Sequence, residues 1–183
     1  MVQLVVALRV ERLALVGCGP VARSGMGPER AARAASRLGG DGPLAVLGLC
    51  GGLTGEVAPG TLLVASEVRG PDGVVPCTAP EALGAALGAR VGPLVSSERI
   101  VRGGAARAAL AADGALAVDM ESYWLAGAAA GRPLAVVRGV VDVPGRELLR
   151  PLATASAALR ALRALRAAVP ALERWAHAAP LTF

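Results

Sequence analysis

Four acidic side chains border aliphatic residues, and they are the groups in this sequence best suited to do chemistry. Glu11 follows the first aliphatic run, and Asp119 and Glu121 form a close pair. Asp142 ends a run of valines, a position that suits a general acid at the carboxyl end of a strand. Burying an unpartnered carboxylate is costly, so each acid needs a reason to be there. The structural alternative is a helix cap or, for Asp142, an ion pair with Arg138.

Two glycine-rich turns are the next candidates, because glycine lets the backbone approach a ligand closely. Ser24-Gly25-Met26-Gly27-Pro28 precedes a helical pattern, and Pro28 suits the first position of that helix. The aliphatic run before Cys50-Gly51-Gly52 predicts a strand that ends in a turn, and ligands of open α/β sheets bind at such carboxyl ends. The alternatives are an ordinary helix start and an ordinary tight turn.

A third glycine pattern, Gly17-x-Gly19-x-x-Ala22, matches the dinucleotide fingerprint and leaves a dinucleotide-dependent oxidoreductase open as an alternative. That fingerprint needs a helix to begin at once so that its N-terminus can hold the pyrophosphate. Pro20, Ser24 and Gly25 interrupt any such helix, which disfavours the dinucleotide hypothesis.

The elements that must position these residues alternate between short aliphatic runs and Ala/Arg/Leu-rich segments of helical period. This pattern predicts one α/β domain over residues 1–183, a three-layer α/β/α sandwich with a mixed central sheet. The predicted strands are 4–8, 13–16, 44–49, 62–68 and 134–141, and the predicted helices are 28–38, 80–87, 105–110, 119–130 and an amphipathic C-terminal helix at about 152–176. Pro170 is expected to kink or end the last helix.

Composition excludes several classes of protein. The net charge of +5 and the pI near 10.4 suggest nucleic acid, but all 19 basic residues are Arg, scattered over helical segments, and aromatic residues make up only 2%. We therefore expect no nucleic-acid partner. Cys18, Cys50, Cys77 and the single His177 do not form a convincing zinc site, so no metal is predicted. Without a signal-peptide pattern or a membrane-length apolar run, we expect a cytoplasmic protein.

Five blocks of the sequence, taken together, resemble the superfamily of purine nucleoside phosphorylases and methylthioadenosine/adenosylhomocysteine nucleosidases in order and spacing. The blocks are Ala7-Leu8-Arg9-Val10-Glu11, Ser24-Gly25-Met26-Gly27, Gly48-Leu49-Cys50-Gly51-Gly52-Leu53, a strand at 57–64, and the pair Val118-Asp119-Met120-Glu121-Ser122 and Val137-Arg138-Gly139-Val140-Val141-Asp142. Within that superfamily, the Gly-Met-Gly-Pro loop and the Val-Asp-Met-Glu-Ser block look most like the hopanoid-associated branch, which is linked to removal of adenine from adenosylhopane. This resemblance implies the same α/β fold and an N-glycosidic cleavage.

The resemblance also implies roles for individual residues. Met120 would pack against the ribose, Glu121 would accept hydrogen bonds from its hydroxyls, and Asp142 would protonate the purine ring. Glu11 matches the position that helps to activate the attacking water in the nucleosidases. The other residues expected to bind substrate are Asp119, Cys50, Gly51, Gly52, Met26 and Gly27, and those expected to bind phosphate are Gly25, Arg23 and Arg30.

Three departures from the family pattern bear on activity. Leu49 replaces a Ser or Thr that donates to phosphate in the phosphorylases, which favours water as the nucleophile. Val141 replaces the Ser that usually orients the catalytic Asp, and the stretch 68–115 is short. We therefore expect cleavage of an adenine-type, 5′-substituted nucleoside without a cofactor other than phosphate as a possible co-substrate, in a homodimer or larger assembly. The alternative is a non-catalytic nucleoside-binding protein.

Overall fold

The computed structural model describes residues 1–144 and 151–179, in which eight strands form one mixed sheet. The strands are β1 (Gln3–Val6), β2 (Val21–Arg23), β3 (Leu44–Gly52), β4 (Leu62–Gly70), β5 (Gly73–Pro76), β6 (Arg90–Ser96), β7 (Ala117–Asp119) and β8 (Leu134–Asp142). The helices are α1 (Arg9–Ala14), α2 (Pro28–Ala35), α3 (Pro80–Leu87), α4 (Gly104–Ala112), α5 (Ser122–Ala126), the 3-10 turn η1 (Gly127–Ala129) and α6 (Pro151–Ala178).

Five of the strands close into a ring. β3 pairs with β8, β8 with β4, β4 with β6, β6 with β7, and β7 again with β3. Because β3 and β8 run parallel, their carboxyl ends meet, and Gly51 lies opposite Asp142. β7 pairs antiparallel with the same end of β3, with Val118 opposite Gly51. The pairing therefore brings the residues that follow three strands to one place.

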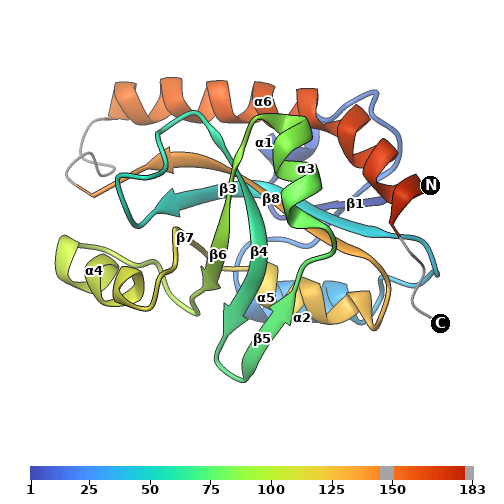
Figure 1. Ribbon diagram of the computed structural model, residues 1–183, viewed down its shortest axis with the longest axis horizontal. Coiled ribbons are helices and arrows are strands. Elements are labelled where there is room, and N and C mark those ends of the chain that lie inside the picture. Colours follow the sequence, from blue (N-terminus) through green and yellow to red (C-terminus); the bar gives the residue numbers. More distant parts are fainter. Residues whose placement is uncertain (145–150, 180–183) are drawn as a thin grey trace.

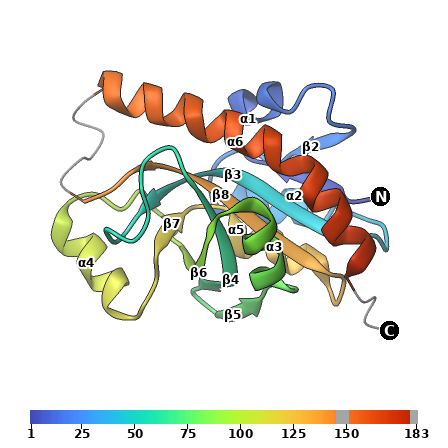
Figure 2. The same cartoon turned by 45° about the horizontal axis from the view of Figure 1, so that its top comes forward.

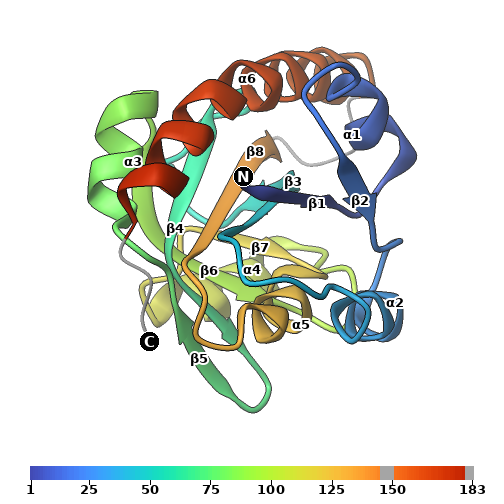
Figure 3. The same cartoon turned by 90° about the vertical axis from the view of Figure 1, so that its right-hand side faces the viewer.

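Helices cover both faces of the sheet, as the sequence predicts. In Figure 1, α6, α1 and α3 lie above the strands, and α2 and α5 lie below them; Figure 3 shows the same two layers from the side. Leu165 and Leu172 of α6 pack on Leu47 in one core, whereas Ala31 of α2 and Leu125 of α5 belong to the core on the opposite face. The predicted three-layer α/β/α fold is confirmed.

The segment 13–16 is not a strand as predicted. Residues 9–14 form α1, and the side chains of Leu13 and Val16 are 67% and 62% exposed. The helix begins here because the Glu11 carboxylate accepts hydrogen bonds from the backbone N–H groups of Ala7 and Leu8, which would otherwise lack partners at the helix start. The aliphatic run therefore forms the end of α1 and the residues that directly follow it.

The dinucleotide fingerprint also lacks its structural context. Gly17 and Gly19 follow α1 and precede the strand β2, so no helix begins after them. The strand–turn–helix geometry that holds a pyrophosphate is absent from this part of the structure. The oxidoreductase alternative therefore loses its only motif.

Other element boundaries differ from the prediction by a few residues. The helix predicted over 119–130 starts only at Ser122, since residues 117–119 form β7, and the matched block at 57–64 becomes a strand only at Leu62. Sequence reasoning missed β2, β5, β6 and β7, which have few aliphatic residues in a row.

The C-terminal helix runs through Pro170 and does not end there. In Figure 1 its red C-terminal part turns away from the line of the orange part, as a proline inside a helix would cause. Nothing in the described residues forms a helix both long and apolar enough to cross a membrane. The predicted single domain includes 145–150 and 180–183, which lie outside the described residues.

Candidate active site

A cavity of about 340 Å³ opens where β3, β7 and β8 end. Most of the residues predicted to act on substrate line it: Glu11, Met26, Cys50, Gly51, Asp119, Met120, Glu121 and Asp142. Leu8, Leu49, Arg99, Ile100, Val101, Arg107, Val118 and Val141 complete the lining. Figure 2 shows α4, which carries Arg107, at the end of the molecule away from the N-terminus. The structure thus gathers the four predicted acids around one cavity.

Asp142 forms a buried ion pair with Arg107, not with Arg138 as the structural alternative predicted. Arg107 Nη2 donates to Oδ2 at 2.9 Å and Nη1 donates to Oδ1 at 3.2 Å, and the two side chains are only 5% and 3% exposed. Nη1 also donates to the carbonyl oxygen of Gly52 at 3.1 Å, while Nε has no partner among the described residues. With Val141 in place of a serine, this guanidinium orients the Asp142 carboxylate.

Sequence reasoning missed Arg107 because it lies in the Ala-rich segment of α4, where no side chain marks a buried face. The available signal is spacing. Leu110 and Ala111 follow Arg107 by three and four residues, so the three share one side of the helix. Leu110 and Ala111 pack against Leu53, and this side faces inward. An arginine on an inward-facing stripe requires a buried acid as its partner.

Arg138 holds the second ion pair of the site. Its Nη2 lies 2.5 Å from Asp119 Oδ2, and Nε and Nη2 donate to Ser122 Oγ at 3.1 and 2.7 Å. Burial alone would lower the pKa of the Arg138 guanidinium, but the surrounding carboxylates, Asp119 first among them, raise it above its ordinary value. Asp119 also accepts hydrogen bonds from Ser96 Oγ at 2.5 Å and from the backbone N–H of Ser122. Asp119 is therefore committed to protein partners and positions the start of α5.

Glu121 is freer than its neighbours. One oxygen, Oε1, accepts the backbone N–H of Gly27 at 2.8 Å, and Oε2 accepts no hydrogen bond from a described residue. Burial raises the pKa of Glu121, although the charge of Arg138 opposes part of that shift. Gly27 therefore anchors Glu121 through its backbone and does not itself line the cavity.

Glu11 is tied down by backbone donors. Its Oε2 accepts the N–H groups of Ala7 and Leu8 at 2.9 and 2.7 Å, and Oε1 accepts the N–H of Leu49 at 2.8 Å. A carboxylate has about four acceptor positions, so about one stays open, on Oε1. Glu11 therefore faces the cavity as a fixed acceptor.

The glycines of β3 make room for the two guanidinium groups. A Cβ atom on Gly48 would lie 2.0 Å from Arg138 Nη1, and one on Gly51 would lie 2.9 Å from Asp142 Oδ1 and 3.3 Å from Arg107 Nη2. Gly52 contributes its carbonyl to Arg107 and is not in the cavity wall. The turn that was predicted to offer backbone amides to a ligand mainly clears space for arginine side chains.

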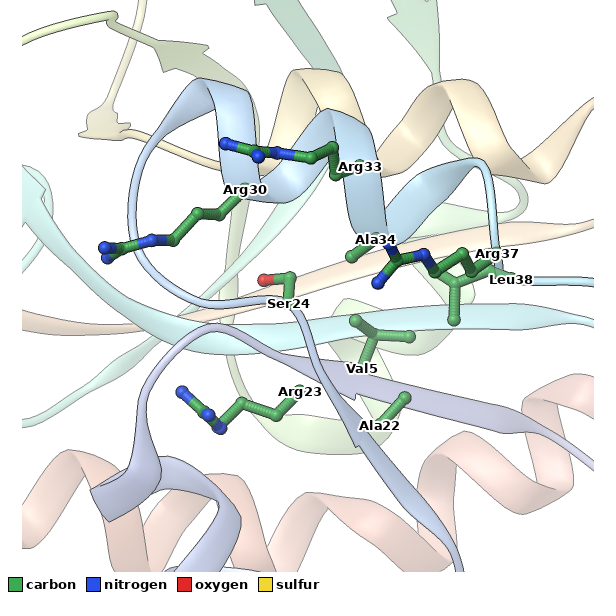
Figure 4. A pocket seen from close by; sticks show the side chains of 9 residues that line it. All are labelled: Val5, Ala22, Arg23, Ser24, Arg30, Arg33, Ala34, Arg37 and Leu38. Atoms are coloured by element: carbon green, nitrogen blue, oxygen red, sulfur yellow. The ribbon is translucent and has the colours of Figure 1, made fainter.

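The residues predicted to bind phosphate lie in neighbouring hollows. Gly25, Arg23 and Arg30 line one of about 490 Å³ together with Leu8 and Met26, which also border the cavity at the strand ends. A larger basic groove continues from it, as Figure 4 shows, and it is lined by Val5, Ala22, Arg23, Ser24, Arg30, Arg33, Ala34, Arg37 and Leu38. Arg23 and Arg30 are therefore adjacent to the site and not in its wall.

Comparison with known proteins identifies the family. The model of the phosphorylase superfamily matches residues 15–170, which is most of the chain. The protein belongs to the phosphorylase superfamily. No curated protein matches its sequence.

Several solved structures have the same fold as this chain. A 5′-methylthioadenosine/S-adenosylhomocysteine nucleosidase from Helicobacter pylori, with a bound inhibitor, gives a TM-score of 0.82 at 15% identity and covers 94% of this chain and 97% of its own. Futalosine hydrolase of Helicobacter pylori gives 0.82 at 16% identity, covering 95% and 97%. The 5′-methylthioadenosine nucleosidase of Arabidopsis thaliana gives 0.80 at 17% identity, covering 98% and 97%.

Proposed function

We propose that this phosphorylase-superfamily protein cleaves the N-glycosidic bond of a purine nucleoside. The observation that carries the proposal is the convergence of Glu11, Glu121 and Asp142, from three separate elements, on one cavity. Membership of the superfamily supports the same reaction, and so do neighbours whose names are those of nucleosidases and a hydrolase. No organic cofactor is needed for this chemistry.

In this proposal each acid acts at a different part of the substrate, according to where charge develops during cleavage. Departure of the base leaves a sugar with oxocarbenium character, so stabilisation is most useful beside the sugar and at the leaving nitrogen. Glu121, with Oε2 open, accepts the ribose hydroxyls beside Met120. Within the ion pair with Arg107 the oxygens of Asp142 act only as acceptors. To act as the general acid, Asp142 therefore takes up a proton from solvent as the bound base displaces part of the Arg107 contact, and then transfers that proton to the ring nitrogen of the leaving purine.

Water is the nucleophile that the geometry favours. Glu11 Oε1 has one open acceptor position, which suits a water molecule that must lose a proton. Leu49 offers no hydroxyl to phosphate, and its backbone N–H already donates to Glu11. The basic hollow around Arg23 and Arg30 remains available to phosphate, so the reaction is to be measured with and without it.

Three finer properties belong to the proposal. The sequence favours an adenine-type base with a 5′ substituent such as the methylthio or hopane group, and Met26 and Ile100, half exposed at the cavity, offer it apolar contacts. A homodimer would cover the exposed aliphatic side chains of Val10, Leu13 and Val16 on and after α1. Three free cysteines suit a reducing cytoplasm.

The test is release of free base from adenosine, inosine and 5′-methylthioadenosine, with and without phosphate, followed chromatographically. Asp142→Asn should lower kcat by about 10²- to 10⁴-fold, the usual contribution of a general acid. Asp72→Asn, an exposed acid in the turn between β4 and β5, serves as the matched control and should leave the rate unchanged. If none of these nucleosides yields free base, the protein is not a nucleosidase of this class.

The alternative is a nucleoside-binding protein without turnover, and one observation favours it. The Arg107–Asp142 ion pair already engages the proposed general acid. Calorimetry distinguishes the two cases, because tight binding of a free base without cleavage of its nucleoside would support the binding protein. Cleavage in water alone would exclude it.

A further inference from the structure

The basic groove beside α2 is lined by four arginines and by no acidic side chain. Its volume is about 640 Å³. Arg30 and Arg33 extend from α2, and Arg37 follows this helix by two residues. Arg23, the last residue of β2, lies on the opposite wall, as Figure 4 shows. The basic hollow shares Arg23 and Arg30 with this groove and adds Arg9, again without an acid in its wall. Five arginines therefore lie along one continuous depression.

Most of the positive charge in the groove lacks a fixed counter-charge. Arg33 pairs with Glu29 at 3.3 Å, but the two side chains are 68% and 86% exposed, and such a pair is weak. The guanidinium groups of Arg23, Arg30 and Arg37 form no ion pair with any described residue. Like charges that are held close together repel each other, and a bound anion relieves this repulsion.

The floor of the groove strengthens its attraction for anions. Val5, Ala34 and Leu38 line it between the arginines, so the floor is apolar. A cleft with charges of one sign and apolar walls focuses its electrostatic potential on the space inside. The planar guanidinium group matches the geometry of phosphate oxygens, to which it donates two parallel hydrogen bonds. The groove is therefore suited to phosphorylated ligands.

The groove extends beyond the place where the sequence predicts a single phosphate. Arg23 and Arg30 line both the groove and the hollow, whereas Arg33 and Arg37 line only the groove. Seven residues of helix rise by about 10 Å, so Arg37 is well separated from Arg30 along the axis. The groove is also larger than the 340 Å³ cavity at the strand ends, which has to hold a nucleoside. One phosphate at the Arg23 and Arg30 end would leave Arg33 and Arg37 without an anion.

We propose that the groove binds a ligand with at least two phosphoryl groups, one near Arg23 and Arg30 and the next along Arg33 and Arg37. This site differs from that of a phosphate co-substrate, which has to reach the sugar in the cavity at the strand ends. Such a phosphate chain has two sources. It is either a free oligophosphate, which goes beyond the proposed function, or an extension of the nucleoside that passes Met26, which borders both cavity and hollow. The second source rests on the proposed function.

Calorimetric titration with inorganic tripolyphosphate and with inorganic phosphate, at 0.15 M salt, tests the site. The wild-type protein should bind tripolyphosphate more tightly than phosphate. An exposed ion pair changes an affinity by about 1.5- to 5-fold. Arg33→Gln combined with Arg37→Gln should therefore weaken tripolyphosphate binding by about 2- to 25-fold, because two such contacts are lost, and should change phosphate binding less.

The matched control removes the same charge elsewhere. Arg163→Gln combined with Arg174→Gln replaces two exposed arginines of α6, which lies on the other face of the sheet from α2 (Figure 1). Screening limits the influence of distant exposed charges at this salt concentration, so the control should keep the wild-type affinity. Equal affinities of the wild type for phosphate and tripolyphosphate, or equal losses in the two double variants, would refute the site.

Release of free base from adenosine and from adenosine 5′-triphosphate distinguishes the two sources. If the phosphate chain belongs to the substrate, kcat/KM is higher for the triphosphate, and the Arg33 and Arg37 double variant loses this advantage. If the ligand is a free oligophosphate, tripolyphosphate binds in the groove although the triphosphate has no such advantage. If neither compound releases base, the proposed function fails, and the titrations alone decide whether the groove binds oligophosphate.

Discussion

Removing Arg138 should destabilise the protein through the acid that it leaves behind. Arg138 is 1% exposed, and its partner Asp119 lies at 2.5 Å in an equally buried position. Breaking a buried ion pair by removing one partner costs about 3–5 kcal/mol, because the remaining charge stays desolvated. Methionine fills much of the vacated volume, so Arg138→Met removes the charge and the hydrogen bonds to Ser122 without leaving a large cavity. The total stability of a domain is only about 5–15 kcal/mol, so the variant should be markedly destabilised.

Urea unfolding measures this effect, with the fluorescence of Trp124 and Trp175 as the signal. For a domain of this size, each kcal/mol shifts Tm by about 2–4 °C, so thermal unfolding of Arg138→Met should occur about 6–20 °C below the wild type. Arg163→Met, an exposed arginine on α6, is the matched control and should change the free energy of unfolding by less than about 0.5 kcal/mol.

A second variant tests the cause. If the cost comes from the orphaned carboxylate, Asp119→Asn added to Arg138→Met should restore part of the lost stability, since contacting residues are not additive. The single amide oxygen, placed where Asp119 Oδ1 lies, can still accept the hydrogen bonds of the Ser96 hydroxyl and of the Ser122 backbone N–H. A cost below about 1 kcal/mol for Arg138→Met, or no recovery in the double variant, would refute the reasoning.

Three further predictions concern individual residues of the cavity. Burial raises the pKa of Glu121, so the rate of base release should begin to fall on acidification at a pH above 4.5, the ordinary pKa of a glutamate. In the wild type, the stability linked to protonated Glu121 is lost as pH rises through the folded pKa. The free energy of unfolding of Glu121→Gln minus that of the wild type should therefore grow from pH 4 to pH 7. Gly51→Ala should displace the Arg107–Asp142 pair and lower kcat by at least about 10-fold, measured beside Gly55→Ala as an exposed control. Glu11→Gln loses a charged acceptor of three backbone N–H groups and should cost about 1–3 kcal/mol in urea unfolding; an unchanged midpoint would contradict its anchoring role.

The acids of the candidate site could be singled out from sequence because they border aliphatic runs, and the family resemblance favoured a functional role for them over a structural one. Asp142 ends a valine run, and the end of a buried strand is a local property of the chain. Asp119 is the last residue of the short strand β7, and Glu121 follows it by two residues. The partner of Asp142 could not be found in this way. Arg107 is 35 residues distant, and only the ring closure of β3, β7 and β8 brings α4 beside the end of β8.

The strands and helices show the same division between local and distant causes. Long aliphatic runs such as 44–49 and 134–141 predicted β3 and β8, because strands buried on both faces need no alternation. The run 13–16 gave a wrong strand prediction, because the Glu11 side chain caps α1 and makes this segment helical. The same side chain also accepts a hydrogen bond from the backbone N–H of Leu49 in β3, which is distant in sequence. The same acid therefore explains the wrong strand prediction at 13–16 and lies in the wall of the candidate site.

The charge arrangement of the cavity sets Glu121 apart from the other three acids. Asp119 has Arg138, Asp142 has Arg107, and Glu11 has three backbone donors, so each of these negative charges is compensated by a fixed partner. Glu121 has one backbone donor and shares the charge of Arg138 with Asp119, and burial raises its pKa. A desolvated carboxylate that is only partly compensated gains most when a positive charge forms beside it. A sugar that becomes cationic as its base leaves is such a charge, so under the proposed function Glu121 is the acid that we expect to stabilise the transition state most.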